Sequence, residues 1–340
     1  MKRILILLIF LKLSLGYSQD PIFTQFYNIP EVLNTGFTGA YQNTKAGVIH
    51  RVQWPALNFS INTQFAYLDT SLDRNGKNGI GFSILNHKET NTRYNLTQLN
   101  LNYSYRVDFN QDFQFRPSIS IGYGAKDYGF QNVLLEDQIN PFSGTISPIS
   151  IDPTLLQDNI MYFDISTSLL FIYRTYNSDV DSWFGITAKH LNKPNISLLY
   201  QGNSALDMFF SIHGSLELPI FTYDRDRSMS FVFNGMKQSE YNRLDFGTHY
   251  TQDWFTFGLL AATNPMRKNP NSHFLTSINA IAGITWENFR FGYSYSFNTS
   301  KIGRDGGVYE LSISWQGGEG LNCFGSVSYT HLTLPTICSV

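Results

Sequence analysis

Hydrophobic and polar residues alternate with a period of two along most of the chain from Ala46 onward. In the segment Phe113–Lys126, for example, Phe115 and Ile121 fall on one face, whereas Arg116 and Ser120 fall on the other. Successive side chains of a β-strand point to opposite faces, so this pattern predicts strands with one apolar and one polar face. A strand of about 10 residues that is tilted can cross the hydrocarbon of a membrane.

The alternation recurs often enough to predict about fourteen strands, an even number typical of bacterial single-chain membrane barrels. The expected strands are Ala46–Trp54, Asn58–Thr70, Asn78–Glu89, Thr92–Val107, Phe113–Lys126, Ile160–Arg174, Ser182–Leu191, Leu206–Phe221, Ser228–Gln238, Arg243–Thr251, Trp254–Thr263, His273–Thr285, Asn288–Asn298 and Gly307–Gln316. We expect the lipid-facing set to include Phe115, Ile119, Ile121, Phe291, Tyr293 and Tyr295. An arginine at Phe291 should therefore destabilise the fold much more than one at Ser294, on the opposite face.

Composition separates a membrane barrel from a soluble β-sandwich, which would also alternate. Charged residues make up 15% of the chain, against about 25% in an average soluble domain, and aromatic residues reach 16%. The polar faces carry Ser, Gly, Asn and Gln with few charges, and aromatic residues gather near strand ends as in interfacial girdles. The fold class predicted is therefore all-β, an antiparallel transmembrane β-barrel of the outer-membrane type. A net charge of -2 argues against nucleic acid as a partner.

The first residues have the pattern of a signal peptide. Lys2 and Arg3 precede the apolar run Ile4–Leu15, and Gly16 and Ser18 are small residues before a cleavage site that we expect at Gln19. An uncleaved anchor is the alternative interpretation. The predicted organisation is a signal peptide (1–18), a periplasmic or lumenal segment (19–45), the barrel (46–325) and a tail (326–340) that is disordered or looks non-native.

Two irregular stretches stand apart from the strands. The segment Gln19–Ala40 has aromatic residues but no steady alternation, so we expect it to lie in the lumen or along the periplasmic mouth, with Phe23 and Phe26 protected from solvent. The loop Asp127–Asn159 is long enough to be either functional or disordered.

Catalytic, cofactor and metal sites are not expected. Ser211, His213, Ser215 and Glu217 share one face of a predicted strand, but residues two apart are separated by about 7 Å, which predicts no direct contact. Lumen lining explains this set better than a hydrolase site, which needs converging groups. The acidic residues at predicted turns lack the spacing of a calcium loop. Cys323 and Cys338 lie near the end of the chain, and a metal site would need four ligands at metal spacing.

Motifs near the predicted mature N-terminus are the most specific in the chain. They begin with Gln19, Asp20, Pro21, Phe23, Gln25, Phe26, Asn34 and Gly39, continue with Arg51, Gln53 and Trp54, and end with Asp152 and Pro153. Together they resemble the PorP/SprF family of type IX secretion and gliding-motility outer-membrane proteins over about residues 19 to 325. Asn34-Thr35-Gly36 departs from the Asn-Pro-Ala of the family, and Ile29-Pro30 from its Asn-Pro.

The resemblance implies a non-enzymatic role in the cell outer membrane. Its implied partners are outer-membrane lipid, a periplasmic ring, a peptidoglycan-binding subunit and a secreted adhesin-like protein whose export or surface attachment the barrel supports. The motif residues are candidates for partner contacts, although Trp54 also fits a membrane-interface anchor. The alternative function is a porin or substrate-specific channel, and the charges predicted for the lumen are too scattered and mixed for the ladders of a porin.

Overall fold

The computed structural model describes residues 19–41, 43–57, 60–73, 75–90, 93–127, 134, 136–148, 159–174, 181–197, 202–221, 224–266, 273–299 and 306–317. The predicted signal peptide, the tail and most of the loop between Asp127 and Asn159 lie outside these residues. Within the described part of the chain, no helix is long and apolar enough to cross a membrane.

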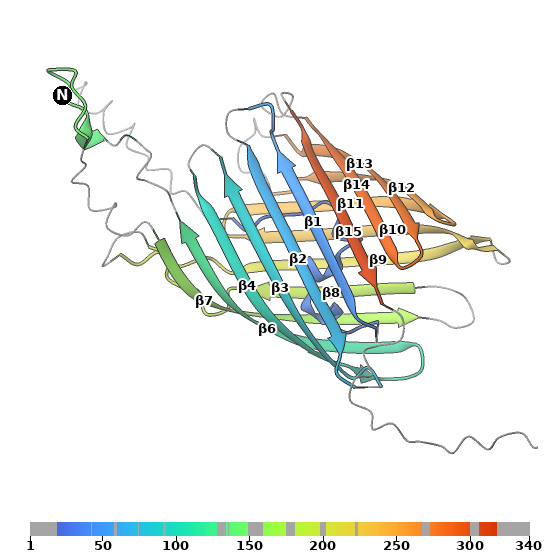
Figure 1. Cartoon of the computed structure of the whole chain (residues 1–340). Coiled ribbons are helices and arrows are strands. Elements are labelled where there is room, and N and C mark those ends of the chain that lie inside the picture. The colour runs from blue at the N-terminus through green and yellow to red at the C-terminus, as the bar shows by residue number, and fades with distance from the viewer. Residues whose placement is uncertain are drawn as a thin grey trace, which may run out of the picture.

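The strands follow one another around a single antiparallel sheet (Figure 1). Their bounds are β1 (Lys45–Gln53), β2 (Ile61–Ser71), β3 (Asn78–Glu89), β4 (Asn95–Tyr105), β5 (Val107–Asp108), β6 (Phe113–Asp127), β7 (Asn159–Arg174), β8 (Asp181–Lys189), β9 (Phe209–Phe221), β10 (Asp224–Gln238), β11 (Tyr241–Gln252), β12 (Phe255–Thr263), β13 (Leu275–Trp286), β14 (Phe289–Asn298) and β15 (Val308–Gln316). Short 3-10 helices are η1 (Pro30–Val32), η2 (Thr35–Phe37) and η4 (Glu136–Gln138).

The sheet closes into a barrel because β1 pairs with β15 and β4 pairs with β6. The two-residue β5 also pairs with β6, and only Arg106 separates it from β4. The two are therefore one interrupted strand, and the wall is a closed barrel of 14 strands, as the sequence predicts. Closure leaves no sheet edge exposed to lipid, where an unpaired backbone group would be costly.

Side chains alternate between the lipid face and the lumen as predicted. Ile119 and Ile121 are exposed on the outside of β6, whereas the intervening Ser118 and Ser120 are buried inside. Tyr293 on β14 is likewise exposed on the outside, next to the buried Ser294. Aromatic side chains on the outside stack on their neighbours, as Phe115 does on Phe171 with ring centroids 4.8 Å apart.

Strand ends differ from the prediction at several places. β4 begins at Asn95, so Arg93 and Tyr94 precede it, and the predicted first residue, Thr92, lies outside the described residues. β9 begins at Phe209 rather than at Leu206. β10 begins at Asp224 rather than at Ser228, because a register shift between these residues lets the ladder with β9 continue. Such an irregularity breaks the period of two locally, so the pattern alone does not reveal it.

The two ends of the barrel differ in the length of their connections. One end, which we call the short-turn end, carries the connections 72–77, 109–112, 175–180, 222–223, 253–254 and 287–288. The other, the long-loop end, carries the connections 54–60, 90–94, 128–158, 190–208, 239–240, 264–274 and 299–307. Outer-membrane barrels have short periplasmic turns and longer extracellular loops, so the long-loop end corresponds to the cell exterior.

Candidate functional site

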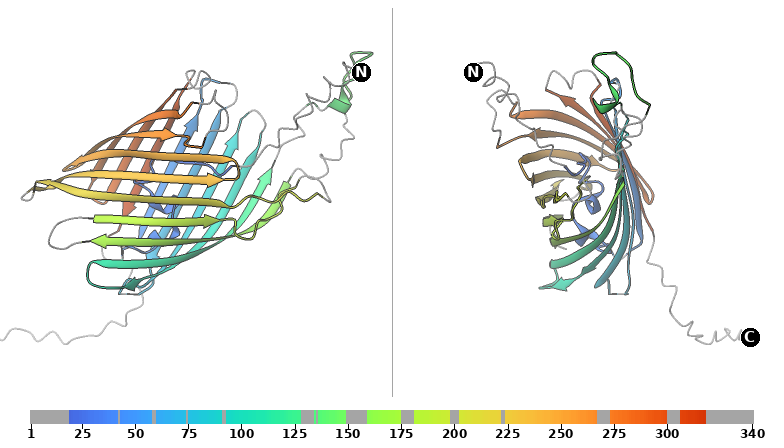
Figure 2. Two further views of the ribbon diagram at one scale, coloured as in Figure 1. Left: turned by 180° about the vertical axis from the view of Figure 1, so that it is seen from behind. Right: turned by 90° about the vertical axis from the view of Figure 1, so that its left-hand side faces the viewer.

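Residues 19–41, which we call the plug segment, lie inside the barrel. Figure 2 shows this blue part of the chain between the opposite walls. Phe23 packs with Ile49 and Phe65 from β1 and β2, while Phe26 packs in a separate cluster with wall residues of β10, β12 and β13. The aromatic side chains that cannot alternate in a strand are thus buried against the inner wall, which removes their apolar surface from water.

The plug segment runs from the long-loop end of the lumen to the short-turn end. Asp20 bonds Gln238, the last residue of β10, at the long-loop end. Gly39 bonds Asp69, close to the end of β2 at the short-turn end. Residues between them contact intermediate levels of the wall, so the segment extends along the lumen before β1 begins at Lys45.

Glu310 on β15 binds the backbone of the plug segment. Its carboxylate accepts hydrogen bonds from the backbone N–H groups of Thr24, at 2.8 and 2.9 Å, and of Gln25, at 3.0 Å. Arg51 on β1 donates from Nη1 to the same carboxylate at 2.9 Å. The Gln25 side chain adds bonds to Ser294 and to the Glu310 carbonyl oxygen. A charged acceptor shared by three donors is among the stronger hydrogen-bonding arrangements in proteins.

Asn34 joins the middle of the plug segment to β9. Its Oδ1 accepts from the Gly36 N–H at 2.7 Å, so its Nδ2 is the group facing His213 Nε2 at 3.0 Å. An amide nitrogen only donates, so His213 Nε2 must accept, and the neutral ring carries its proton on Nδ1. That proton is then donated to Ser211 Oγ, 2.8 Å away, while Ser211 donates to Asn234.

The prediction that Ser211 and His213 do not touch is therefore wrong. The backbone spacing of about 7 Å holds, but the imidazole ring leans along the strand and closes the gap. The polarity of the bonds is the reverse of a Ser–His catalytic pair, in which the serine proton points at the histidine. Within the described residues, no cluster of His, Cys, Asp and Glu could hold a metal ion.

Arg116 and Asp69 hold the plug segment near the short-turn end. The buried Arg116 guanidinium donates to the carbonyl oxygens of Gly36 and Thr38, each at 3.0 Å. Asp69 accepts from the Gly39 N–H at 2.8 Å. Gly39 has φ +64, and a Cβ there would lie 2.7 Å from the Gly79 Cα, so both the backbone conformation and the close approach require glycine.

Asp20 forms an ion pair with His190, the residue after β8. His190 Nε2 lies 3.0 Å from Asp20 Oδ1, and its Nδ1 lies 2.9 Å from Asp164 on β7. Burial alone would lower the pKa of His190, but Asp20 and Asp164 raise it to about 9. Burial would raise the pKa of Asp20, yet the charges of His190 and Lys189 hold it well below its usual range. Both partners are thus charged at neutral pH.

The pair should loosen at high pH. Because the pKa of His190 is higher in the folded protein than in the unfolded chain, the ion pair stabilises the fold. This stabilisation is complete below pH 6.5, the ordinary histidine pKa, and is lost as the pH rises through about 9. The pKa of Asp20 is lowered instead, so its contribution to stability is complete above pH 3.8 and declines only at more acidic pH. A spin label on Gln19→Cys, with Cys323 and Cys338 replaced by serine, should be immobile at pH 6 and mobile at pH 10. The same label in His190→Gln should show no such change with pH, and equal mobility of the parent at both pH values would contradict the assignment.

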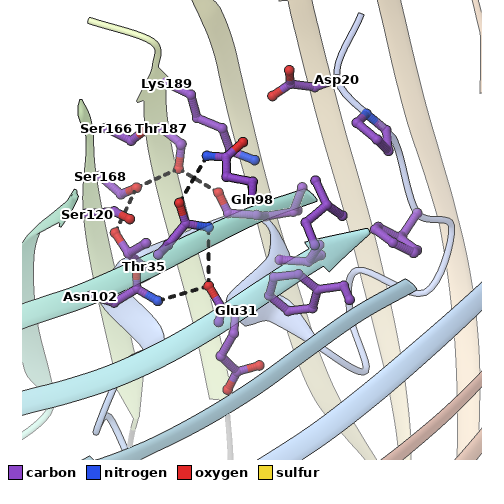
Figure 3. Close-up of a pocket in the computed structure, with 18 residues that line it drawn as sticks. Asp20, Glu31, Thr35, Gln98, Asn102, Ser120, Ser166, Ser168, Thr187 and Lys189 are labelled. Carbon is purple, nitrogen blue, oxygen red and sulfur yellow. Dashed lines mark hydrogen bonds between the residues drawn. The ribbon is translucent and has the colours of Figure 1, made fainter. Parts of the chain in front are cut away.

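A cavity of about 60 Å³ remains between the plug segment and the wall formed by β2, β3, β4, β6, β7 and β8. Figure 3 shows the hydroxyl- and amide-bearing side chains of the wall gathered on one side of the cavity, with Asp20 of the plug segment lying apart from them and the Glu31 carboxylate turned away. The polar lining comprises Ser83, Gln98, Asn100, Asn102, Ser120, Ser166, Ser168, Thr187 and Lys189. At roughly 10–15 Å³ for each water, the space holds a few water molecules.

A family model described as the type IX secretion system membrane protein PorP/SprF matches residues 15–315. The chain belongs to this family. Membership places this PorP/SprF protein in the outer membrane and implies that it associates with type IX secretion components. No curated protein matches the chain.

Solved outer-membrane barrels are similar to this PorP/SprF protein in fold at low sequence identity. The KdgM porin shares 8% identity at a TM-score of 0.39, with 81% of this chain and 99% of that chain covered. The Pseudomonas putida toluene transporter TodX shares 8% identity at a TM-score of 0.47, with 88% of this chain and 94% of that chain covered. A Pseudomonas aeruginosa FadL homologue shares 10% identity at a TM-score of 0.42, with 83% of this chain and 92% of that chain covered.

Most motif residues that resemble the PorP/SprF family meet in the lumen. Asp20, Phe23, Gln25, Phe26, Asn34 and Gly39 make the contacts described above, Pro21 lines the cavity, and Gln19 is exposed beside them. Arg51 binds Glu310 and also donates to Gln53 at 3.0 Å. Trp54 follows β1 in a left-handed conformation with φ 55. Asp152 and Pro153 lie outside the described residues.

The wall partners of these motif residues could not be assigned from the sequence. In the sequence, the alternation places Glu310 and Arg116 on the lumen face, but other scattered charged residues fall on that face as well. A charged residue on an otherwise Ser- and Gly-rich lumen face is the signal that could have marked both as anchors, since buried charges require partners.

Proposed function

We propose that this PorP/SprF barrel acts by binding partner proteins of the type IX secretion apparatus, without catalysing a reaction, and so supports export or surface attachment of a secreted adhesin-like protein. The observation that carries the proposal is the occupied lumen. Residues 19–41 run along it from end to end and are held by charged groups of β1, β2, β6 and β15 and by His190.

The occupied lumen favours partner binding over a porin. Solute flow would require displacement of a segment whose backbone N–H and C=O groups bond to Glu310, Asp69 and Arg116. Buried groups of this kind are costly to leave without partners. The bond polarity at Ser211 likewise favours a structural role for the serine–histidine contact on β9.

A hairpin in the long connection between β6 and β7 offers a surface for a partner. Ile139 and Ile146 form a bridge across it, and the Asn140 side chain accepts from the Phe142 and Ser143 N–H groups at its turn. Phe142 at the tip is 99% exposed. A large aromatic side chain presented on a fixed turn is the type of residue that anchors protein interfaces.

Deletion of the gene for this protein should trap one secreted protein inside the cell, while uptake of small solutes stays unchanged. Surface and medium proteomics of the deletion strain and its parent would measure the first effect, and a solute-uptake assay the second. Complementation with Phe142→Ser should restore the barrel in the outer membrane but lower export, whereas Thr145→Ala, on the same hairpin, should restore both. Intact export with reduced solute uptake would favour the channel function instead.

A further inference from the structure

A pocket of about 120 Å³ lies in the lumen at the long-loop end. Thr24 of the plug segment forms part of its lining, and the wall contributes residues of β1, β11, β13, β14 and β15. The polar part of the wall lining includes Arg51, Gln53, Arg243, Ser296 and Asn298. Because the long-loop end faces the cell exterior, a ligand would enter this pocket from outside.

Among the residues that the structure describes, the lining of the pocket contains two guanidinium groups and no carboxylate. Arg51 pairs with Glu310 at 2.9 Å, and Arg243 donates from Nε to Asp245 at 2.8 and 3.0 Å. Neither Glu310 nor Asp245 lines the pocket. Each guanidinium has five N–H donors, of which these bonds use only some. Each arginine is thus paired with an adjacent carboxylate behind the lining, and the remaining guanidinium N–H groups are the donors that it can offer to a ligand.

Two further groups complete a surface rich in hydrogen-bond donors. The Gln53 Oε1 atom accepts a hydrogen bond from Arg51. The Gln53 side-chain amide can therefore still donate its two N–H groups to a ligand. Thr24 is 1% exposed, and its Oγ1 has no hydrogen-bond partner among the described residues. A ligand or a water molecule in the pocket would supply the partner that this buried hydroxyl lacks.

We propose that this pocket binds one oxyanion, a carboxylate or phosphate group, that enters from the cell exterior. Two arginine side chains supply N–H donors of the kind that bind such a group, and the pocket has room for the group together with several water molecules. The site goes beyond the partner-binding function proposed above and does not depend on it. The oxyanion is either a free small anion or the terminal carboxylate of a polypeptide.

Isothermal titration of the purified full chain in detergent at low ionic strength can test the site with four probes. These are acetate, inorganic phosphate, and triglycine with a free or an amidated C-terminus. Saturable binding of acetate or phosphate is expected if the ligand is a free anion. Binding of free but not amidated triglycine, at least tenfold tighter than acetate, would identify a chain terminus. Absence of saturable binding for all four probes overturns the proposal.

Asn298→Asp places a carboxylate in the pocket without breaking either arginine pair, so binding should weaken at least tenfold. Asn95→Asp is the matched control, because it adds the same charge at the long-loop end of β4, five strands away from β14 in the sheet. Should Asn298→Asp not fold, Gln53→Glu provides the same test by neutralising Arg51 from within the pocket. Equal binding by the parent, the pocket variant and the control overturns the proposal.

Discussion

Replacing Glu310 with alanine should lower the free energy of unfolding by about 3–5 kcal/mol, the range for breaking a buried ion pair by removing one partner. Arg51 would keep its charge in a buried position without its carboxylate. The N–H groups of Thr24 and Gln25 would lose the acceptor that now binds both. Urea unfolding of the barrel refolded into phospholipid vesicles, followed by tryptophan fluorescence, measures the change.

A second variant separates the lost ion pair from the lost contact with the plug segment. Arg51→Met added to Glu310→Ala removes the uncompensated charge, so the double variant should be more stable than the sum of the two single changes predicts. If the effects of the two substitutions simply add, Glu310 and Arg51 are not paired as described. If Glu310→Ala unfolds like the parent, Glu310 does not hold the plug segment through Thr24 and Gln25.

An arginine on the lipid face should be nearly as costly. Leu99 lies near the middle of β4 and is exposed on the outside of the barrel, so Leu99→Arg should cost about 2–4 kcal/mol if it lies at the bilayer midplane. The adjacent Gln98 faces the lumen, lines the cavity and donates to Asp164 at 3.3 Å. Gln98→Arg should be tolerated better, because the new charge can pair with that carboxylate.

The same vesicle-based urea unfolding compares these two neighbours at nearly equal depth. Similar losses at both positions would contradict the assignment of faces. Ser294, expected from the sequence to be a tolerant lumen position, is not a suitable control. It is 1% exposed and bonds Gln25, so an arginine there would have to displace the plug segment.

The wall could be predicted from the sequence because its pattern is local. Alternation over adjacent positions is enough to assign Ile121 to the lipid and Ser120 to the lumen, and closure is expected because an open sheet edge in lipid would leave backbone groups unpaired. Strand ends were less predictable, because the interruption at Arg106 and the register shift near Ser228 depend on the neighbouring strand.

The lumen contacts could not be derived in the same way. Thr24 and Glu310 are 286 positions apart in the sequence, and Asp20 and His190 are 170 apart. No periodicity links such pairs, and the irregular plug segment predicts burial but not its partners. The resemblance marked Asp20, Gln25 and Asn34 as a set, whereas Glu310, Arg116 and His213 became visible as binding groups for the plug segment only in the folded barrel.

Residues 19–41 occupy the lumen, and we expect them to prevent the barrel from acting as an open pore. Single-channel recording in planar lipid bilayers tests this most directly, with the full chain compared with a variant in which residues 20–38 are replaced by a Gly/Ser linker of equal length. We expect the full chain to show no stable conductance steps and the variant, once its folding is verified by heat-modifiable electrophoretic mobility, to show them. Steady open-channel steps from the full chain, equal to those of the variant, would contradict the account.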